Sequence, residues 1–130
     1  MTRPRAKGNL REDVVQALFA ENGRYAIVQR GSGSKGTKQQ LVPNRVAGDV
    51  VVLPRPWQEN FGIQIEVGGP GKRFEAEFAD LRAAAVPGYA LVLAIFAGMK
   101  PKRWLLADDD GGWTECSDFT DLLGTIEARS

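Results

Sequence analysis

The spacing of apolar residues along the chain predicts three helices and five strands. Three segments repeat apolar residues every three or four positions, which is the period of a helix that buries one face. Other segments are short apolar runs bounded by glycine, proline or polar residues, which is typical of strands. The predicted helices span residues 10–21, 74–85 and 118–128, and the predicted strands span residues 25–29, 49–53, 61–67, 89–96 and 103–107. We therefore expect an α/β fold class, with strand 89–96 central in the sheet because its apolar run is the most continuous.

Capping signals and breaks in this pattern predict where the elements end. Asn9 is placed to cap the first helix, Asn22-Gly23 to end it, and Asp118 to cap the last helix. Residues 1–8 combine proline, glycine and several cations, so we expect a flexible basic arm. Residues 30–46 are rich in glycine, serine and cations and poor in aliphatic residues, which predicts a mobile basic loop.

Composition limits the class of protein. A chain of 130 residues has the size of one domain, 1–130, and its 43% hydrophobic and 25% charged residues are ordinary for a globular protein. The longest apolar run, residues 89–99, is much shorter than the roughly 20 residues that span a bilayer. The N-terminus lacks the apolar stretch of a secretory signal, and the single cysteine has no partner for an internal disulfide. We therefore expect a cytoplasmic protein that binds no membrane.

The absence of histidine narrows the possible chemistry. It excludes Ser-His-Asp and Cys-His hydrolysis and any zinc site that relies on imidazole, and one cysteine cannot build a thiolate cluster. Any metal must then be held by oxygen ligands, which suit Mg²⁺, with Mn²⁺ as a substitute. The phosphate-loop motif GxxxxGK[ST] is absent, and we expect no small-molecule cofactor.

Charge is unevenly distributed along the chain, although the net charge is only +1. Residues 1–45 carry nine Lys or Arg against three Asp or Glu, whereas residues 106–130 carry one against seven. A basic first third followed by an acidic tail favours a nucleic-acid partner. The alternative interpretation is a solvated surface whose charge is simply uneven.

Two carboxylates stand at neighbouring ends of predicted strands. Asp49 opens one strand, and Glu66 lies in the apolar run Ile63–Val67 of the next. If these strands pair antiparallel, the start of one lies beside the end of the other. An ionised carboxylate in apolar surroundings needs a partner, and a divalent cation is the strongest one. Such an ion supports phosphodiester hydrolysis without histidine, because it activates water and stabilises phosphoryl charge.

A series of short motifs also carries a resemblance to a known nuclease family. In order and in approximate spacing, the chain resembles the archaeal-type Holliday junction resolvases of the restriction-endonuclease-like PD-(D/E)XK superfamily. The motifs are Lys7-Gly8, Arg11-Glu12, Tyr25–Arg30, Gly31–Lys35, Gly48–Val51 and Ile65–Val67, and the resemblance extends to about residue 107. It implies a restriction-endonuclease-like fold with a central mixed sheet. It also implies a magnesium-dependent endonuclease that cleaves four-way DNA junctions as a homodimer.

The resemblance assigns roles to individual residues. Glu12, Asp49 and Glu66 would be metal ligands, and Ser32 would reach toward the scissile DNA strand. The remaining DNA contacts would hold phosphates rather than read sequence. The residues implied in DNA binding are Arg5, Lys7, Arg11, Arg30, Ser32, Ser34, Lys35 and Lys38.

Two positions depart from the family pattern. Gly48 stands where the family has proline, and Gly68 stands where it has a lysine that orients the attacking water and stabilises the transition state. The loss of one such charge can cost about 100- to 1,000-fold in rate. Lys72 is the expected replacement, because the glycines at 68, 69 and 71 allow unusual backbone paths. Lys35 and Lys38 are the alternatives.

Plainer interpretations exist for each acidic residue taken alone. Glu12 is compatible with a solvated helix position and Asp49 with a turn cap. Glu66 is compatible with an ion pair to Arg73 or Arg45. Only the combination of the three, in this order, favours a metal site.

Two alternative functions follow from the same residues. One is a DNA-binding protein of the same fold that lost catalysis at Gly68, and the other is a nuclease of a different DNA substrate. Trp57, Trp104 and Trp113 fit core or interface packing better than base stacking, and Cys116 fits an ordinary small residue rather than an activated thiolate.

Overall fold

The computed structural model describes residues 4–29, 48–54, 62–71 and 73–129, with side chains from residue 10 onward. Within these ranges the chain forms three helices and six strands. Their bounds are α1 (Pro4–Glu21), β1 (Ala26–Val28), β2 (Val50–Val52), β3 (Gly62–Gly68), α2 (Phe74–Ala83), β4 (Tyr89–Ala97), β5 (Lys100–Ala107), β6 (Trp113–Cys116) and α3 (Phe119–Arg129). The α/β class expected from the sequence is confirmed.

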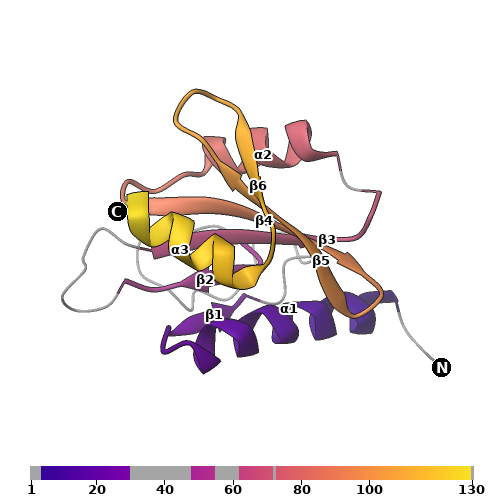
Figure 1. Ribbon diagram of the computed structural model, residues 1–130. Coiled ribbons are helices and arrows are strands. Elements are labelled where there is room, and N and C mark those ends of the chain that lie inside the picture. The colour runs from indigo at the N-terminus through magenta and orange to yellow at the C-terminus, as the bar shows by residue number, and fades with distance from the viewer. Residues whose placement is uncertain (1–3, 30–47, 55–61, 72, 130) are drawn as a thin grey trace.

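The strands form one mixed sheet in the order β1-β2-β3-β4-β5-β6 (Figure 1). All neighbours pair antiparallel except β3 and β4, which are parallel. A parallel pair needs a crossover connection, and α2 supplies it between β3 and β4. The expectation that strand 89–96 is central is confirmed, because β4 lies between β3 and β5.

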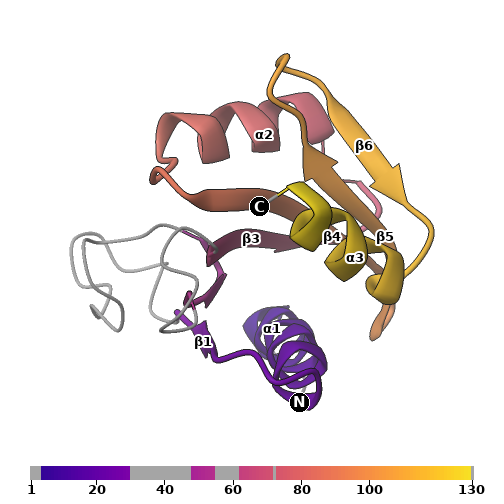
Figure 2. The ribbon, with the colours of Figure 1, turned by 60° about the vertical axis from the view of Figure 1, so that its left-hand side comes forward.

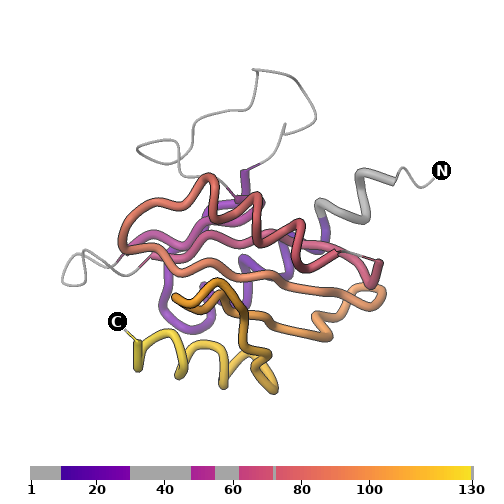
Figure 3. Tube along the Cα trace, turned by 90° about the horizontal axis from the view of Figure 1, so that it is seen from above, coloured from indigo at the N-terminus to yellow at the C-terminus, as the bar shows by residue number. Residues whose placement is uncertain are grey.

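The helices cover both faces of the sheet. Figure 2 shows α2 on one side and α1 with α3 on the other, and in Figure 3 α3 lies along the β5–β6 side. On the α2 face, Phe78 and Leu81 pack against Leu93 and Leu105. The other face holds the larger core. There, alternate residues of the strands pack with residues of α1 and α3.

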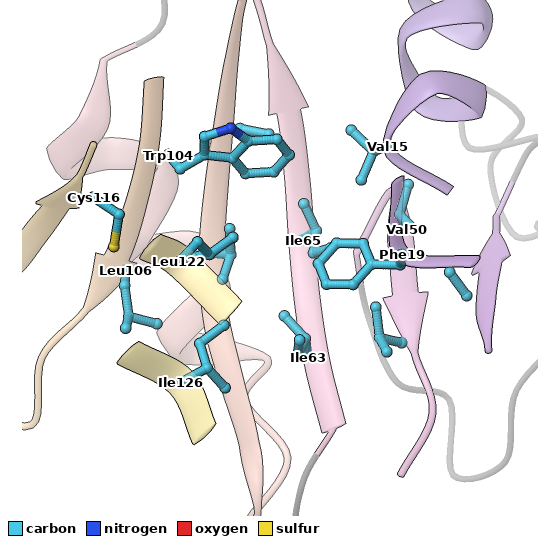
Figure 4. Packing of buried hydrophobic residues seen from close by; sticks show 14 of the residues in the cluster. Val15, Phe19, Val50, Ile63, Ile65, Trp104, Leu106, Cys116, Leu122 and Ile126 are labelled. Atoms are coloured by element: carbon cyan, nitrogen blue, oxygen red, sulfur yellow. The ribbon is translucent and has the colours of Figure 1, made fainter. Parts of the chain in front are cut away.

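Phe19 is the main contact between α1 and this larger core. It is fully buried beside Ile65 and Val50 (Figure 4), and its ring meets the edge of Phe119 at a centroid distance of 4.9 Å. Trp104 stands 5.2 Å from the same Phe119 ring, so α1, β5 and α3 meet around one aromatic group. Aromatic pairs at such separations add stabilisation beyond the apolar area they bury.

The first helix begins earlier than the sequence pattern predicts. The predicted start at residue 10 and the Asn9 cap are wrong, because α1 starts at Pro4 and residue 9 lies inside it. Proline is favoured at the first helical position, where its missing N–H has no helical partner and its φ is preset. Residues 4–8 of the predicted flexible arm are therefore helical. At the other end of the chain the Asp118 cap is confirmed, since its Oδ1 accepts a hydrogen bond from the Asp121 N–H at 2.8 Å.

The sixth strand is the second difference from the sequence expectation, which had five. Strand β6 is an edge strand whose middle residues, Thr114 and Glu115, are exposed, so it lacks the apolar run by which strands are found. Cross-strand contacts define it instead. Arg103 of β5 donates two hydrogen bonds to the Glu115 carboxylate, at 2.9 and 2.6 Å. Thr114 Oγ1 donates to the Asp108 carboxylate at the hairpin turn.

None of the helices in the described ranges combines the length and the apolar character needed to cross a membrane.

The packing of α1 predicts a large difference between two substitutions on that helix. Phe19→Ala removes a fully buried ring, so the free energy of unfolding should fall by about 3–5 kcal/mol. Leu10→Ala, at a residue 52% exposed, should change it by less than about 0.5 kcal/mol. Urea denaturation followed by circular dichroism measures both. Similar losses for the two variants would contradict the position of α1 on the sheet.

Candidate functional site

Strands β2 and β3 bring Asp49 to the end of β3 that carries Glu66. The two strands are antiparallel with Val50 opposite Ile65, so Asp49, just before β2, and Glu66, just after Ile65, lie at the same end of the pair. The antiparallel pairing expected from the sequence is confirmed, and with it the placement of both residues at one end of the β2–β3 pair.

The Asp49 carboxylate is oriented by the backbone of β3. Its Oδ2 accepts a hydrogen bond from the Val67 N–H at 2.9 Å, and its own N–H donates to the Ile65 carbonyl at 2.8 Å. Hydrogen bonds that end on a carboxylate are stronger than neutral ones. Because Oδ2 is held by Val67, the direction of the remaining oxygen, Oδ1, is fixed as well. The plain turn-cap interpretation of Asp49 is thus incomplete, since the carboxylate bonds to the neighbouring strand.

Gly48 allows this close approach of the two strands. Its φ is +137°, and a Cβ added there would lie 3.2 Å from both the N and the O of Ile65. A side chain would therefore press directly on the β3 backbone. Proline is excluded for a second reason, because its ring holds φ near −65°. The glycine that stands where the resolvase pattern has proline is therefore the residue that this backbone requires.

Glu66 and Glu12 belong to opposite sides of the sheet. Ile65 and Val67 pack into the core under α1, whereas Gln64 faces the α2 side, where it bonds to Ala84 and Val86. Because side chains alternate along a strand, Glu66 is on the Gln64 side. Glu12 comes from α1, and its Oε1 is buried. To reach Asp49 and Glu66, the Glu12 side chain would therefore have to pass around the carboxyl end of β3.

Arg11 anchors α1 to that end of the sheet. Its Nε donates to the Gly98 carbonyl at 2.8 Å, and its guanidinium carbon lies 5.8 Å from the centre of the Phe96 ring. A Cβ on Gly69 would lie 3.1 Å from Arg11 Nη1, so the glycine gives the guanidinium room beside the end of β3. The side chain expected to hold DNA phosphate thus has a structural contact as well.

The three predicted metal ligands do not form a common cage. In the described part of the chain, no group of three or more Asp, Glu, His or Cys residues is arranged to hold a metal ion. Glu12, Asp49 and Glu66 are all described, and Asp49 and Glu66 lie at the same end of the β2–β3 pair. Glu12 as a third ligand stays a prediction.

Most of the predicted DNA-binding residues fall outside what the structure describes. Gly68, which stands where the resolvase pattern has a lysine, is buried at the end of β3. Its expected replacement, Lys72, lies outside the described residues, and the predicted loop 30–46 does too. The same holds for Arg30, Ser32, Ser34, Lys35 and Lys38, for Arg45 and Trp57, and for the side chains of Arg5 and Lys7.

Gln29 is a site residue that the sequence analysis did not identify. It follows β1 and is only 3% exposed. Its side-chain Nε2 donates to the Gly48 carbonyl at 3.0 Å, and its backbone N–H donates to the Asp49 carbonyl at 2.9 Å. No local signal marks it, because a glutamine before an arginine and a glycine-serine run is normally solvated.

A pocket lies away from this pair, at the amino end of β4. Its lining includes Arg82, Tyr89 and Arg129. Arg82 Nη2 donates to the Gly112 carbonyl at 2.6 Å, and Arg129 pairs with Asp108 at 2.9 Å. The polar groups of the pocket thus hold the β5–β6 hairpin to α2 and α3, which gives them a structural role.

The described tryptophans and the cysteine are packing residues, as expected. Trp104 is buried, and Trp113 stacks on Phe78 with ring centroids 5.5 Å apart. Cys116 is buried in the larger core (Figure 4), and this burial raises the pKa of its thiol. A raised pKa disfavours the reactive thiolate.

Comparison with known proteins assigns no family to the chain. No protein-family model matches the sequence, and a comparison with curated proteins finds no significant match.

The backbone at Gly48 predicts a stability difference between two glycine substitutions. Gly111→Ala changes a glycine with φ +96° and open space around it, and should lower the free energy of unfolding by about 1–2 kcal/mol. Gly48→Ala adds a clash with β3 to the same kind of strain, so the loss should exceed about 2 kcal/mol. Chemical denaturation measures both. Equal losses would mean that β2 and β3 do not approach as closely as described.

Proposed function

We propose that this protein is a metal-dependent DNA endonuclease in which Asp49 and Glu66 form the ion-binding pair. The observation that carries the proposal is the Asp49 carboxylate, held at the end of β3 by the N–H of Val67, the residue that follows Glu66. Two neighbouring carboxylates repel each other unless a cation lies between them. Oxygen ligands of this kind suit Mg²⁺ or Mn²⁺, and the chain has no histidine to offer another metal.

A pair of carboxylates is a sufficient protein contribution for magnesium. Mg²⁺ keeps several waters and is usually bound through one or two carboxylates together with substrate phosphates. The lack of a three-acid cage among the described residues is therefore compatible with a site completed by DNA. When bound, the ion would lower the pKa of a water ligand and stabilise charge on the phosphoryl oxygens. Glu12 would be a further ligand of the ion, at the end of the sheet that Arg11 holds against α1.

The substrate we propose is branched DNA, four-way junctions above all. This part rests on the motifs that the chain shares with the archaeal-type Holliday junction resolvases and on its basic first third. A two-fold dimer would present two identical sites to two strands of such a junction. The residues proposed to hold the DNA are Arg5, Lys7, Arg11, Arg30, Ser32, Ser34, Lys35 and Lys38, with Lys72 as the charge that replaces the family lysine.

A second candidate is a DNA-binding protein without catalysis. It is favoured by Gly68, a buried glycine at the position where the strand would carry the lysine. Both candidates bind DNA, and they differ only in cleavage. Incubating labelled four-way junction, duplex and single-stranded DNA with the protein, with and without Mg²⁺, separates them. Junction binding without cleavage in either Mg²⁺ or Mn²⁺ selects the second candidate.

The ion-binding pair predicts the effect of two isosteric substitutions on cleavage. Asp49→Asn and Glu66→Gln each remove one of the charges that hold the ion, so the single-turnover cleavage rate should fall by about 1,000-fold or more. Junction affinity in a gel-shift assay should stay the same or rise, since negative charge near the DNA is lost. Glu115→Gln is the matched control, because its carboxylate pairs with Arg103 on β5 and is 45% exposed. It should cleave within about twofold of the wild type, and normal cleavage by Asp49→Asn would rule the site out.

The proposed phosphate contacts predict a steep salt dependence of binding. Cations that neutralise phosphates release bound counterions, so the affinity for a four-way junction should fall by at least about tenfold between roughly 50 and 200 mM salt. Fluorescence anisotropy with a labelled junction measures this. An affinity that does not change with salt would contradict DNA as the partner.

A further inference from the structure

We infer that Gln29 is a positioning residue for Asp49, a role that rests on the proposed function of the Asp49–Glu66 pair. The chain leaves β1 at Gln29 and returns to the sheet at Gly48 after residues 30–47. Gln29 joins the two ends of this segment through its side-chain and main-chain bonds to Gly48 and Asp49. The residue therefore acts on the peptide that carries the Asp49 side chain.

The peptide between Gly48 and Asp49 depends on Gln29 for the hydrogen bond to its carbonyl. With φ at +137°, Gly48 turns its peptide out of the regular strand conformation, and its carbonyl points away from the β2–β3 ladder to the Gln29 amide. A buried carbonyl needs a hydrogen-bond donor, and the Gln29 amide, itself 3% exposed, supplies one out of contact with solvent. Gln29 thus fixes the Gly48 carbonyl on one side, and Ile65 fixes the Asp49 N–H on the other.

The consequence for Asp49 is a carboxylate with a single orientation. The peptide before Asp49 is held through its carbonyl by Gln29 and through its N–H by Ile65, so the Cα–Cβ direction of Asp49 is set. From that direction Oδ2 reaches the Val67 N–H at 2.9 Å. Residues that orient a metal ligand in this way typically contribute about 10- to 100-fold to metal affinity or activity.

A second buried glutamine offers a matched control. Gln64 is fully buried on β3, where its Nε2 donates to the Ala84 carbonyl and its Oε1 accepts from the Val86 N–H. Those contacts join the sheet to the connection between α2 and β4. Gln64→Met therefore removes a comparable buried amide, whereas only Gln29→Met removes the side-chain hydrogen bond to the peptide that precedes Asp49.

The first test does not depend on activity. Amide hydrogen exchange of the Val67 N–H, measured by NMR relative to the amides of β4, reports whether Asp49 Oδ2 is in place. Gln29→Met should lower the relative protection of Val67 by about tenfold or more, because a hydrogen bond to a charged group is lost. Gln64→Met should leave that ratio unchanged. Gln29→Asn keeps an amide but is one methylene shorter, and should lower the ratio in the same direction if Gln29→Met does not fold. An unchanged Val67 ratio in the Gln29 variants would overturn the inference.

The second test uses junction cleavage by the full-length protein. In Gln29→Met the kcat should fall by about 10- to 100-fold and the Mg²⁺ concentration for half-maximal rate should rise, while KM for the junction changes little. Gln64→Met should keep both values. Equal effects of the two substitutions would reduce Gln29 to a stabilising residue and overturn the inference. A wild-type protein that cleaves no DNA would refute the proposed function instead, and the exchange measurement would still decide the role of Gln29.

Discussion

The contact between the Gly48–Asp49 peptide and the backbone of Ile65 is the constraint on which the candidate site depends. It combines a hydrogen bond from the Asp49 N–H with an approach so close that a Cβ at position 48 would lie 3.2 Å from β3. From this contact the Asp49 carboxylate reaches the Val67 N–H, one residue beyond Glu66. The orientation of the Asp49 carboxylate and the proposed metal site both require this approach of β2 to β3.

The rest of the fold supports that contact from both faces of the sheet. On one face, α1 packs through Phe19 against Ile65 and holds the end of β3 through Arg11 and Gly69. On the other face, Gln64 ties β3 to the connection that follows α2. Strand β3 is therefore packed on both of its faces, and it is the contact of Arg11 with Gly69, on the α1 side, that lies nearest to the carboxyl end where the acidic residues are. Sites built on strands hold their geometry more precisely than sites on loops.

The sequence predicted the parts of the site that depend on local pattern. Valine-rich and isoleucine-rich runs identified β2 and β3, and their antiparallel pairing then put Asp49 and Glu66 at the same end of the two strands. It could not predict Gln29 or the contact of Arg11 with Gly98, because these join positions 19 and 87 residues apart. Burial of the Gln29 amide follows from the conformation of Gly48, which the sequence alone does not reveal. Strand β6 escaped prediction for a similar reason, since cross-strand contacts such as Arg103 with Glu115 define it.

Paramagnetic broadening by Mn²⁺ in a two-dimensional ¹⁵N–¹H NMR spectrum tests the ion-binding pair most directly. Substoichiometric Mn²⁺ broadens the amides nearest the site that it occupies, even where its affinity is low. We expect the signals of Asp49, Glu66 and Val67 to broaden first, and this selectivity to disappear in Asp49→Asn. Broadening centred on the acidic turn Asp108–Asp110, with Glu66 and Val67 unaffected, would contradict a metal site at the end of β3.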